Sequence, residues 1–154
     1  MKLKVGDEAP NFKLKNQNNQ EVELKNYLGS NVLVYFYPAD FTPHCTSQAC
    51  NLRNNFEKLT SQDIKILGIS TDSPEKHAQF IKEYDLPFDL LSDEGGKISE
   101  TYDSLYEPKF LGISFGRLSK RNSFLVGKDG KITKIMEDVE PQTHAYEILH
   151  FCEK

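Results

Sequence analysis

Two short apolar runs, each bounded by polar turn residues, constrain the fold of this chain more than any other feature. Residues 31–37 read Asn-Val-Leu-Val-Tyr-Phe-Tyr, and residues 64–70 read Ile-Lys-Ile-Leu-Gly-Ile-Ser. Strands with so few polar positions are typical of parallel sheets that are covered on both faces. Helical patterns lie between and after the two runs, so the order of segments predicts an α/β fold with parallel strand pairs.

The remaining segments extend this alternation toward both ends of the chain. We expect an N-terminal hairpin over 11–24 and a second hairpin from 122–127 and 131–137, across the turn Lys128-Asp-Gly130. Further elements are predicted as helices at 43–59, 74–84, 95–102 and 141–151 and a short strand at 88–91. The least regular stretch, 103–120, is rich in large apolar side chains, so we expect it to pack on the domain or on a partner.

Length and charge narrow the class of protein. The chain has 154 residues, enough for one domain with a sizeable core, and we expect a single domain over 1–154. A net charge of -4 gives no electrostatic reason to expect nucleic-acid binding. No apolar run approaches the roughly 18 residues that span a bilayer, and the first eight residues lack the apolar segment of a secretory signal. We therefore expect a cytoplasmic protein with no membrane partner.

The segment Thr42-Pro43-His44-Cys45 marks a helix start that carries a thiol. Thr is a good N-cap and Pro is favoured at the next position, which registers Cys45 at the third helical residue. The free N–H groups and partial positive charge at that point stabilise an anion, so a thiolate is favoured there. The alternative is that Cys45 is a small buried residue at the start of a helix.

Cys50 lies five residues further on. In an intact helix the two Cα atoms are about 8–9 Å apart, beyond the ~7 Å limit for a disulfide, so bridging would require the first turns to unwind. Cys50 could equally be a core residue. The spacing Cys-x4-Cys does not match thioredoxin-type exchange, and a zinc site of His44, Cys45 and Cys50 lacks an obvious fourth ligand.

A thiolate that attacks a peroxide benefits from a donor aimed at the leaving oxygen, and arginine is suited to this task. The chain has three arginines, Arg53, Arg117 and Arg121. Position along the chain alone does not select one of them.

The residues around Cys45 resemble the active-site signature of the peroxiredoxins. Pro38-x-x-x-Thr42-x-x-Cys45 matches that signature, and the segment 36–53 resembles the bacterioferritin-comigratory-protein class, also called peroxiredoxin Q. The resemblance extends in order over nearly the whole chain, through Gly6-Asp-x-Ala-Pro-Asn-Phe12, Leu67-Gly-Ile-Ser-x-Asp-Ser-Pro74, Leu86-Pro-Phe-x-Leu-Leu-Ser-Asp93, Arg121-x-Ser-Phe-Leu-Val126 and Asp129-Gly-Lys-Ile132.

This resemblance implies a thioredoxin-like fold, with a central mixed sheet flanked by helices, and an antioxidant enzyme that reduces hydrogen peroxide and organic hydroperoxides. Cys45 would be the peroxidatic cysteine and Cys50 the resolving cysteine, which together form a disulfide that thioredoxin or a similar donor reduces. Thr42 would hydrogen-bond the thiolate or the peroxide, Pro38 would shield the thiolate from water, and Arg121 would be the activating arginine. The resemblance implies no metal and no organic cofactor.

Two positions depart from the usual pattern of the class. His44 stands where Gly is common, and Gln48 where Glu is common; neither change removes a catalytic group. Cys152 matches no resolving position and is expected to be a bystander. The resemblance favours a monomer, although the apolar residues of 103–120 leave a weak dimer open.

Other functions remain to be weighed against the peroxidase. A thiol-disulfide oxidoreductase on the same fold would be expected to carry Cys-x2-Cys, which is absent. A peroxide-sensing or chaperone-like protein could use Cys45 only as a redox switch, and the sequence does not separate that role from catalysis.

Overall fold

A computed structural model describes residues 2–152, so residues 1 and 153–154 of the predicted domain lie outside the described residues. In chain order the elements are β1 (Lys13–Lys15), β2 (Glu21–Glu23), the 3-10 helix η1 (Leu24–Tyr27), β3 (Asn31–Phe36), α1 (Pro43–Asn54), α2 (Phe56–Ser61), β4 (Ile64–Ser70), α3 (Pro74–Tyr84), β5 (Asp89–Ser92), α4 (Lys97–Thr101), β6 (Leu105–Tyr106), β7 (Lys109–Phe110), β8 (Ile113–Ser114), β9 (Leu118–Ser119), β10 (Ser123–Val126), β11 (Ile132–Met136) and α5 (His144–Cys152).

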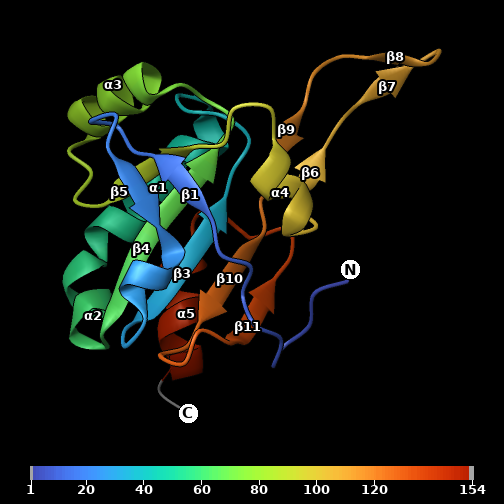
Figure 1. Cartoon of the computed structure of the whole chain (residues 1–154). Helices are drawn as coiled ribbons and strands as arrows, with labels where there is room; N and C mark the ends of the chain where they lie inside the picture. The colour runs from blue at the N-terminus through green and yellow to red at the C-terminus, as the bar shows by residue number, and fades with distance from the viewer. Residues whose placement is uncertain (1, 153–154) are drawn as a thin grey trace.

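A seven-stranded mixed sheet forms the centre of the molecule (Figure 1). Its strand order is β11-β10-β3-β4-β5-β1-β2. The two apolar runs become β3 and β4, which pair in parallel, and β5 continues the parallel part. The predicted hairpins add antiparallel strands at both edges, β1 and β2 at one and β10 and β11 at the other. The predicted α/β fold with a mixed sheet is confirmed.

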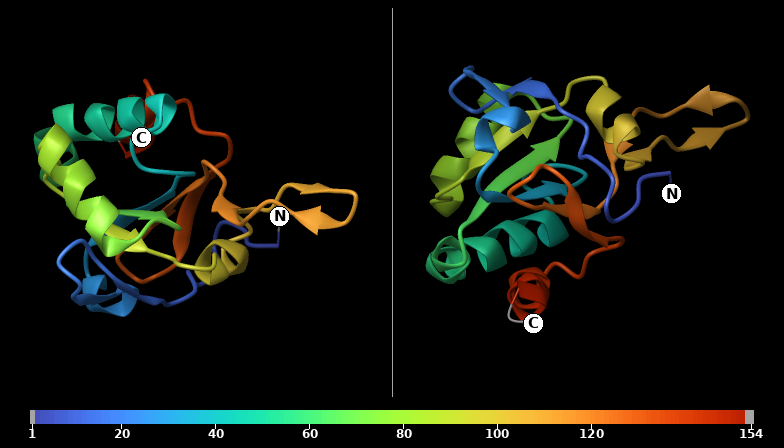
Figure 2. Two further views of the ribbon diagram at one scale, coloured as in Figure 1. Left: turned by 90° about the horizontal axis from the view of Figure 1, so that it is seen from above. Right: turned by 60° about the horizontal axis from the view of Figure 1, so that its bottom comes forward.

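Side chains that alternate along β3 supply two separate hydrophobic cores. Leu33, Tyr35 and Tyr37 point to the face that α1, α2, α3 and α5 cover. Val32, Val34 and Phe36 point to the opposite face, where the N-terminal segment and Tyr102 complete the core. Figure 2 shows the sheet between these two layers. Because both faces of β3 are buried, the run that encodes it contains almost no polar residue.

Two helices differ clearly from the prediction, and α4 is shorter than the predicted 95–102. The helix expected over 43–59 is divided at Asn55 into α1 and α2. The Asn55 side chain donates to the carbonyl oxygen of Asn51 at 2.9 Å, and such local bonds compete with the helical pattern. The last helix begins at His144 rather than at 141. The predicted cap of α3 is confirmed, because the Ser73 hydroxyl accepts from the N–H of Lys76.

The stretch 103–120 forms two small ladders, β6 with β9 and β7 with β8. The second ladder is the tip of an arm that projects from the body in all three ribbon views of Figures 1 and 2. The expectation that its apolar residues pack on the domain is wrong for five side chains, which are exposed: Tyr106, Phe110, Leu111, Ile113 and Phe115. Packing of the arm on a partner stays a prediction.

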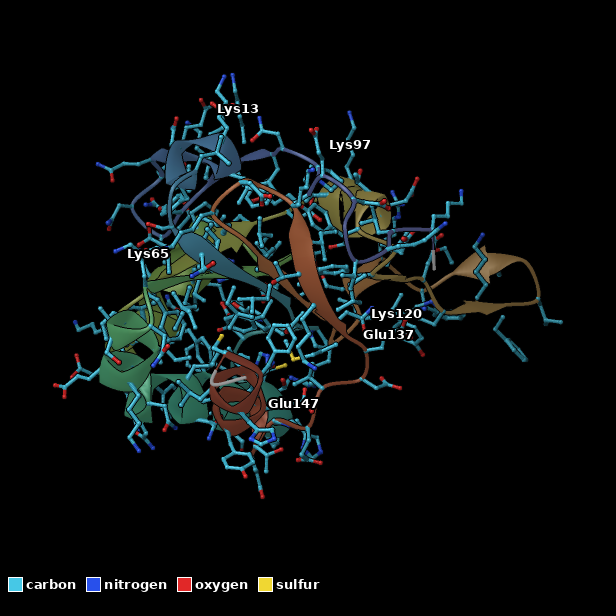
Figure 3. The ribbon with its side chains drawn as sticks, turned by 90° about the horizontal axis from the view of Figure 1, so that it is seen from below. Lys13, Lys65, Lys97, Lys120, Glu137 and Glu147 are labelled. Carbon is cyan, nitrogen blue, oxygen red and sulfur yellow. The ribbon has the colours of Figure 1, made fainter. Side chains whose placement is uncertain are left out.

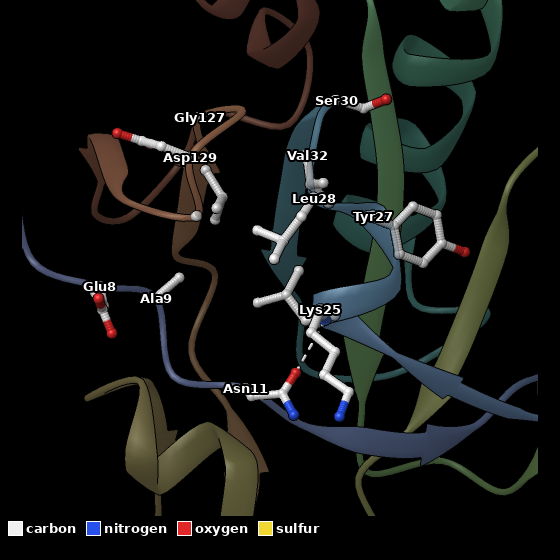
Figure 4. Close-up of a pocket in the computed structure, with 13 residues that line it drawn as sticks. Glu8, Ala9, Asn11, Lys25, Tyr27, Leu28, Ser30, Val32, Gly127 and Asp129 are labelled. Atoms are coloured by element: carbon white, nitrogen blue, oxygen red, sulfur yellow. Dashed lines mark hydrogen bonds between the residues drawn. The ribbon is translucent and has the colours of Figure 1, made fainter.

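A pocket of about 200 Å³ lies at the end of the sheet where β3 begins (Figure 4). Leu24, Val32 and Val126 give it an apolar wall, and charged residues such as Lys25 and Asp129 stand at its rim. No cysteine lines it. Within residues 2–152, none of the helices has both the length and the apolar character that a membrane crossing requires.

Gly68 of β4 provides a test of the packing between the sheet and the helices. A Cβ atom at this position would lie 2.7 Å from Leu90 and 2.8 Å from the ring of Tyr35, both in the core. We expect Gly68→Ala to lower the free energy of unfolding by about 1–3 kcal/mol, because a packed core resists added volume. Denaturant unfolding measures this change, with the exposed Lys65→Ala on the same strand as control. Equal midpoints for the two variants would contradict the packing described here.

Candidate active site

Cys45 follows the loop that connects β3 to α1 and is the third residue of this helix. Thr42 is the N-cap residue, with extended backbone dihedrals, and Pro43 follows it as predicted. Only 2% of Cys45 is exposed to solvent. The first N–H groups of a helix have no partner within it, so an anionic sulfur at this position faces donors rather than acceptors.

Of the three arginines, only Arg121 reaches Cys45. Its Nη2 donates to the Cys45 Sγ at 3.2 Å, and its Nη1 donates to Oε1 of Gln48 at 2.8 Å. Arg53 instead donates to the carbonyl oxygen of Tyr84. Arg117 pairs with acidic side chains at the base of the arm. A guanidinium in this position can donate both to the sulfur and to an oxygen bound beside it.

A chain of polar side chains continues behind Arg121. Gln48 is fully buried on α1, and its Nε2 lies 3.1 Å from Nδ1 of His144, the first residue of α5. His144 is also buried. Burial, together with the nearby positive charge of Arg121, lowers the pKa of His144 to about 3. The imidazole is therefore neutral at ordinary pH.

Thr42 and Pro38 border the same site. The Thr42 hydroxyl donates to the carbonyl oxygen of Ala39 at 2.9 Å, and the residue itself is exposed. Pro38 is half-buried in the loop between β3 and α1. His44 is exposed beside Cys45. Thus the structure places Thr42 and Arg121 at the helix start that carries Cys45, and Pro38 in the loop that leads to it.

Cys50 lies on the same continuous helix as Cys45 and is half-buried. All three cysteines are free thiols. Because α1 is unbroken from Pro43 to Asn54, the expectation that the helix separates the two thiols applies to this conformation. Cys152 lies on α5, where partial burial raises the pKa of its thiol.

A buried network fixes the loop that precedes Cys45. His77 Nδ1 lies 2.7 Å from Oδ2 of Asp40, and the hydroxyl of Tyr37 donates to Oδ1 of the same carboxylate at 2.6 Å. The N–H of Asp40 donates to Asp72, and His77 Nε2 lies 3.0 Å from the carbonyl oxygen of Leu91. These contacts tie the loop to β5 and α3, so the start of α1 has a fixed position.

The zinc alternative receives no support from the arrangement. In the described part of the chain, the only group of three or more potential metal donors within 4.8 Å is Asp40, Asp72 and His77. His44, Cys45 and Cys50 do not form such a group. The polar atoms of Asp40 and His77 already hydrogen-bond one another and their neighbours.

Sequence reasoning did not find His144, Asp40 or His77. His144 is 96 residues away from Gln48 along the chain, and a single histidine before an apolar helix carries no signal of its own. The sequence showed that Gln48 replaces the usual Glu of the class. It did not show the contact of Gln48 with Arg121, which depends on the pairing of strands far apart in the sequence.

A thioredoxin-like sheet that places a helix-start cysteine beside an arginine defines the class of thiol-dependent peroxidases. Residues 5–135 match the AhpC/TSA family, and the chain belongs to this family of peroxiredoxins. The chain is 41% identical to Peroxiredoxin Bcp of Escherichia coli (strain K12), over 99% of this chain and 97% of that protein.

Solved structures agree with this assignment. The peroxidoxin BcpB of Mycobacterium tuberculosis is similar with a TM-score of 0.87 and 28% identity, covering 98% of this chain and 97% of that one. The bacterioferritin comigratory protein of Xanthomonas campestris gives a TM-score of 0.84 at 25% identity, over 92% and 90% of the two chains. The predicted thioredoxin-like fold and the predicted enzyme class are confirmed. Membership of the family implies a hydroperoxide substrate and a thiol reductant.

The buried neutral His144 predicts a loss of stability in acid. Its pKa is about 3 when folded against about 6.5 when unfolded, so below pH 6.5 protons bind the unfolded chain first. The stabilising contribution is complete above pH 6.5 and is lost as pH falls toward 3. Relative to His144→Asn, the free energy of unfolding of the wild type should fall by about 1.4 kcal/mol per pH unit below 6.5. Denaturant unfolding across this range measures the difference, and parallel curves would contradict the burial of a neutral imidazole.

Proposed function

We propose that this peroxiredoxin reduces hydrogen peroxide and organic hydroperoxides through Cys45. The observation that carries the proposal is the 3.2 Å contact between Arg121 Nη2 and the Cys45 Sγ at the start of α1. This contact places a permanent positive charge and a donor next to the one sulfur at the helix N-terminus. The Xanthomonas campestris relative is described as having alkyl peroxide reduction activity, which supports organic hydroperoxides as substrates.

In the first step the Cys45 thiolate attacks the terminal oxygen of the hydroperoxide. An S–O bond forms and the O–O bond breaks, so the sulfur is oxidised to a sulfenic acid and the peroxide is reduced. The leaving oxygen takes a proton and departs as water or alcohol. Arg121 would donate to the oxygen that gains negative charge, and Thr42 would turn its hydroxyl from Ala39 toward the thiolate or the peroxide. Pro38 would keep water from the sulfur.

Cys50 then resolves the intermediate. Its thiol displaces the hydroxyl of the sulfenic acid, so that a disulfide forms and water leaves. The two residues occupy one helix, so the reaction requires α1 to open around residues 42–52. Opening of one helix is a local transition that costs less than global unfolding.

A dithiol donor of the thioredoxin type would return both cysteines to thiols and become a disulfide itself. We therefore also propose a cytoplasmic location, because such donors keep thiols reduced there. Cys152 takes no part in the cycle.

Catalytic turnover separates the peroxidase from a sensor. We expect Cys45→Ser to abolish peroxide-dependent oxidation of NADPH in the presence of thioredoxin and its reductase. Cys50→Ser should keep the first oxidation of Cys45 but lose thioredoxin-dependent turnover, because no disulfide can form within the chain. Cys152→Ser is the matched control and should turn over like the wild type. A wild type that consumes one equivalent of peroxide and then stops would be a redox switch instead.

Opening of the helix has its own test. Hydrogen exchange of the amides in residues 42–52 should be faster in the Cys45–Cys50 disulfide form than in the reduced form, because the bridge cannot form across an intact helix. The exchange of β3 and β4 should be the same in both forms and serves as an internal control. Protection of α1 that survives oxidation would refute the opening.

A further inference from the structure

Arg121 is held at Cys45 by an ordered series of hydrogen bonds that begins on the last helix. His144 of α5 contacts Gln48 of α1, Gln48 contacts Arg121, and Arg121 contacts the Cys45 sulfur. The three donor–acceptor distances are 3.1, 2.8 and 3.2 Å. Gln48 and His144 are both buried, with exposures of 0% and 1%, so water does not compete for these contacts.

The chemistry of the groups fixes the direction of each bond in this series. An arginine side chain only donates, so the Gln48 atom that faces Arg121 must be the carbonyl oxygen. The amide nitrogen of Gln48 then faces His144 and must donate. His144 Nδ1 is therefore an acceptor without a proton, and the imidazole is the neutral tautomer that carries its hydrogen on Nε2. A proton on Nδ1 would place two donors, this N–H and the Gln48 amide, face to face with no acceptor between them.

The surroundings of His144 keep it in this state. Arg121 is the charged group that faces it from the β10 side, and the ring of Tyr35 from β3 packs edge-on at 6.0 Å. From α1 it meets the neutral amide of Gln48. On its own helix the nearest titratable side chains, Tyr146, Glu147 and His150, are exposed. Figure 3 shows the labelled Glu147 at the outside of α5. Nε2, which carries the hydrogen of the ring, is buried and has no hydrogen-bond partner among the described residues, so the contact of Nδ1 with Gln48 is the polar contact that orients the ring.

We propose that His144 is a positioning residue for peroxide reduction. Its unprotonated Nδ1 fixes the amide of Gln48, and this amide presents its oxygen to Arg121 and holds the guanidinium against the Cys45 sulfur. Without the acceptor on α5, the Gln48 amide can rotate and turn its nitrogen toward Arg121, which removes the second anchor of the guanidinium. The inference rests on the proposed role of Cys45 and adds α5 to the active site.

A double-mutant cycle tests this role. The measured quantity is the second-order rate constant for oxidation of Cys45 by hydrogen peroxide, obtained by competition with a second peroxidase. His144→Leu should lower it by about tenfold or more, as loss of an orienting partner does at other sites. Gln48→Leu should cause a similar loss, and adding His144→Leu to it should change the rate constant by no more than about twofold, because His144 acts only through Gln48.

Two further variants separate positioning from a general structural role. His144→Asn keeps an acceptor oxygen near the place of Nδ1 and should restore the rate constant to within about threefold of the wild type. His150→Leu changes an exposed histidine on the same helix and should leave it unchanged. Losses that multiply in the double variant, or a His144→Leu enzyme as fast as the wild type, would overturn the proposal.

One measurement on the wild type does not depend on the folding of His144→Leu. Two-bond ¹⁵N–¹H correlations of the histidines report which ring nitrogen carries hydrogen, and His144→Asn identifies the signal. We expect the Nε2–H tautomer of His144 throughout the neutral range. A proton on Nδ1 would overturn the proposal even if His144→Leu fails to fold. A wild type that shows no Cys45-dependent reaction with peroxide would instead refute the proposed function, while the tautomer would stay as described.

Discussion

The antiparallel register of β3 with β10 is the constraint on which the candidate site depends. Ser123 pairs with Tyr35, and the N–H of Phe36 donates to the carbonyl oxygen of Asn122 at 2.8 Å. Continuing this register places Arg121 beside the end of β3, where the chain turns into α1. Arg121 and Cys45 are 76 residues apart in sequence, and this ladder is what brings them together. A slip of one residue would turn Arg121 to the other face of the sheet.

The same strand divides the interior into two cores and explains which parts of the fold could be read from the sequence. β3 and β4 were predicted because burial on both faces leaves an unbroken apolar pattern. Cys45 was predicted as the reactive residue because a helix start depends on local sequence, and Thr42-Pro43 is a typical helix start. The break at Asn55 was missed because the competing bond from its own side chain to Asn51 is a detail of geometry. The arm could not be placed, because its apolar residues look like core residues in sequence yet are exposed.

Contacts between residues that are far apart in the sequence explain why the rest of the site could not be predicted. The sequence did not show which of the three arginines lies at Cys45. In the structure, the sheet register places Arg121 at the sulfur, whereas Arg53 donates to a backbone carbonyl oxygen. The sequence did not indicate a role for His144 or His77, because each contacts a partner on a distant segment of the chain. Both are buried histidines close to the same helix start, but their environments differ. His77 faces the carboxylate of Asp40, whereas His144 faces an amide nitrogen and a guanidinium.

Asn51 of α1 links the helix that carries the thiols to the end of the chain. Its Oδ1 accepts from the N–H of Ala145 in the first turn of α5, at 2.8 Å, and its Nδ2 donates to the carbonyl oxygen of Gln142 at 3.0 Å. One side chain thus accepts from an N–H in the first turn of α5, which has no partner within the helix, and also binds the segment that leads into α5. If α1 opens as far as Asn51, α5 loses its N-terminal anchor at the same moment. Under the proposed mechanism, the redox state of two sulfurs in the first third of the chain would in this way be coupled to the attachment of the last helix.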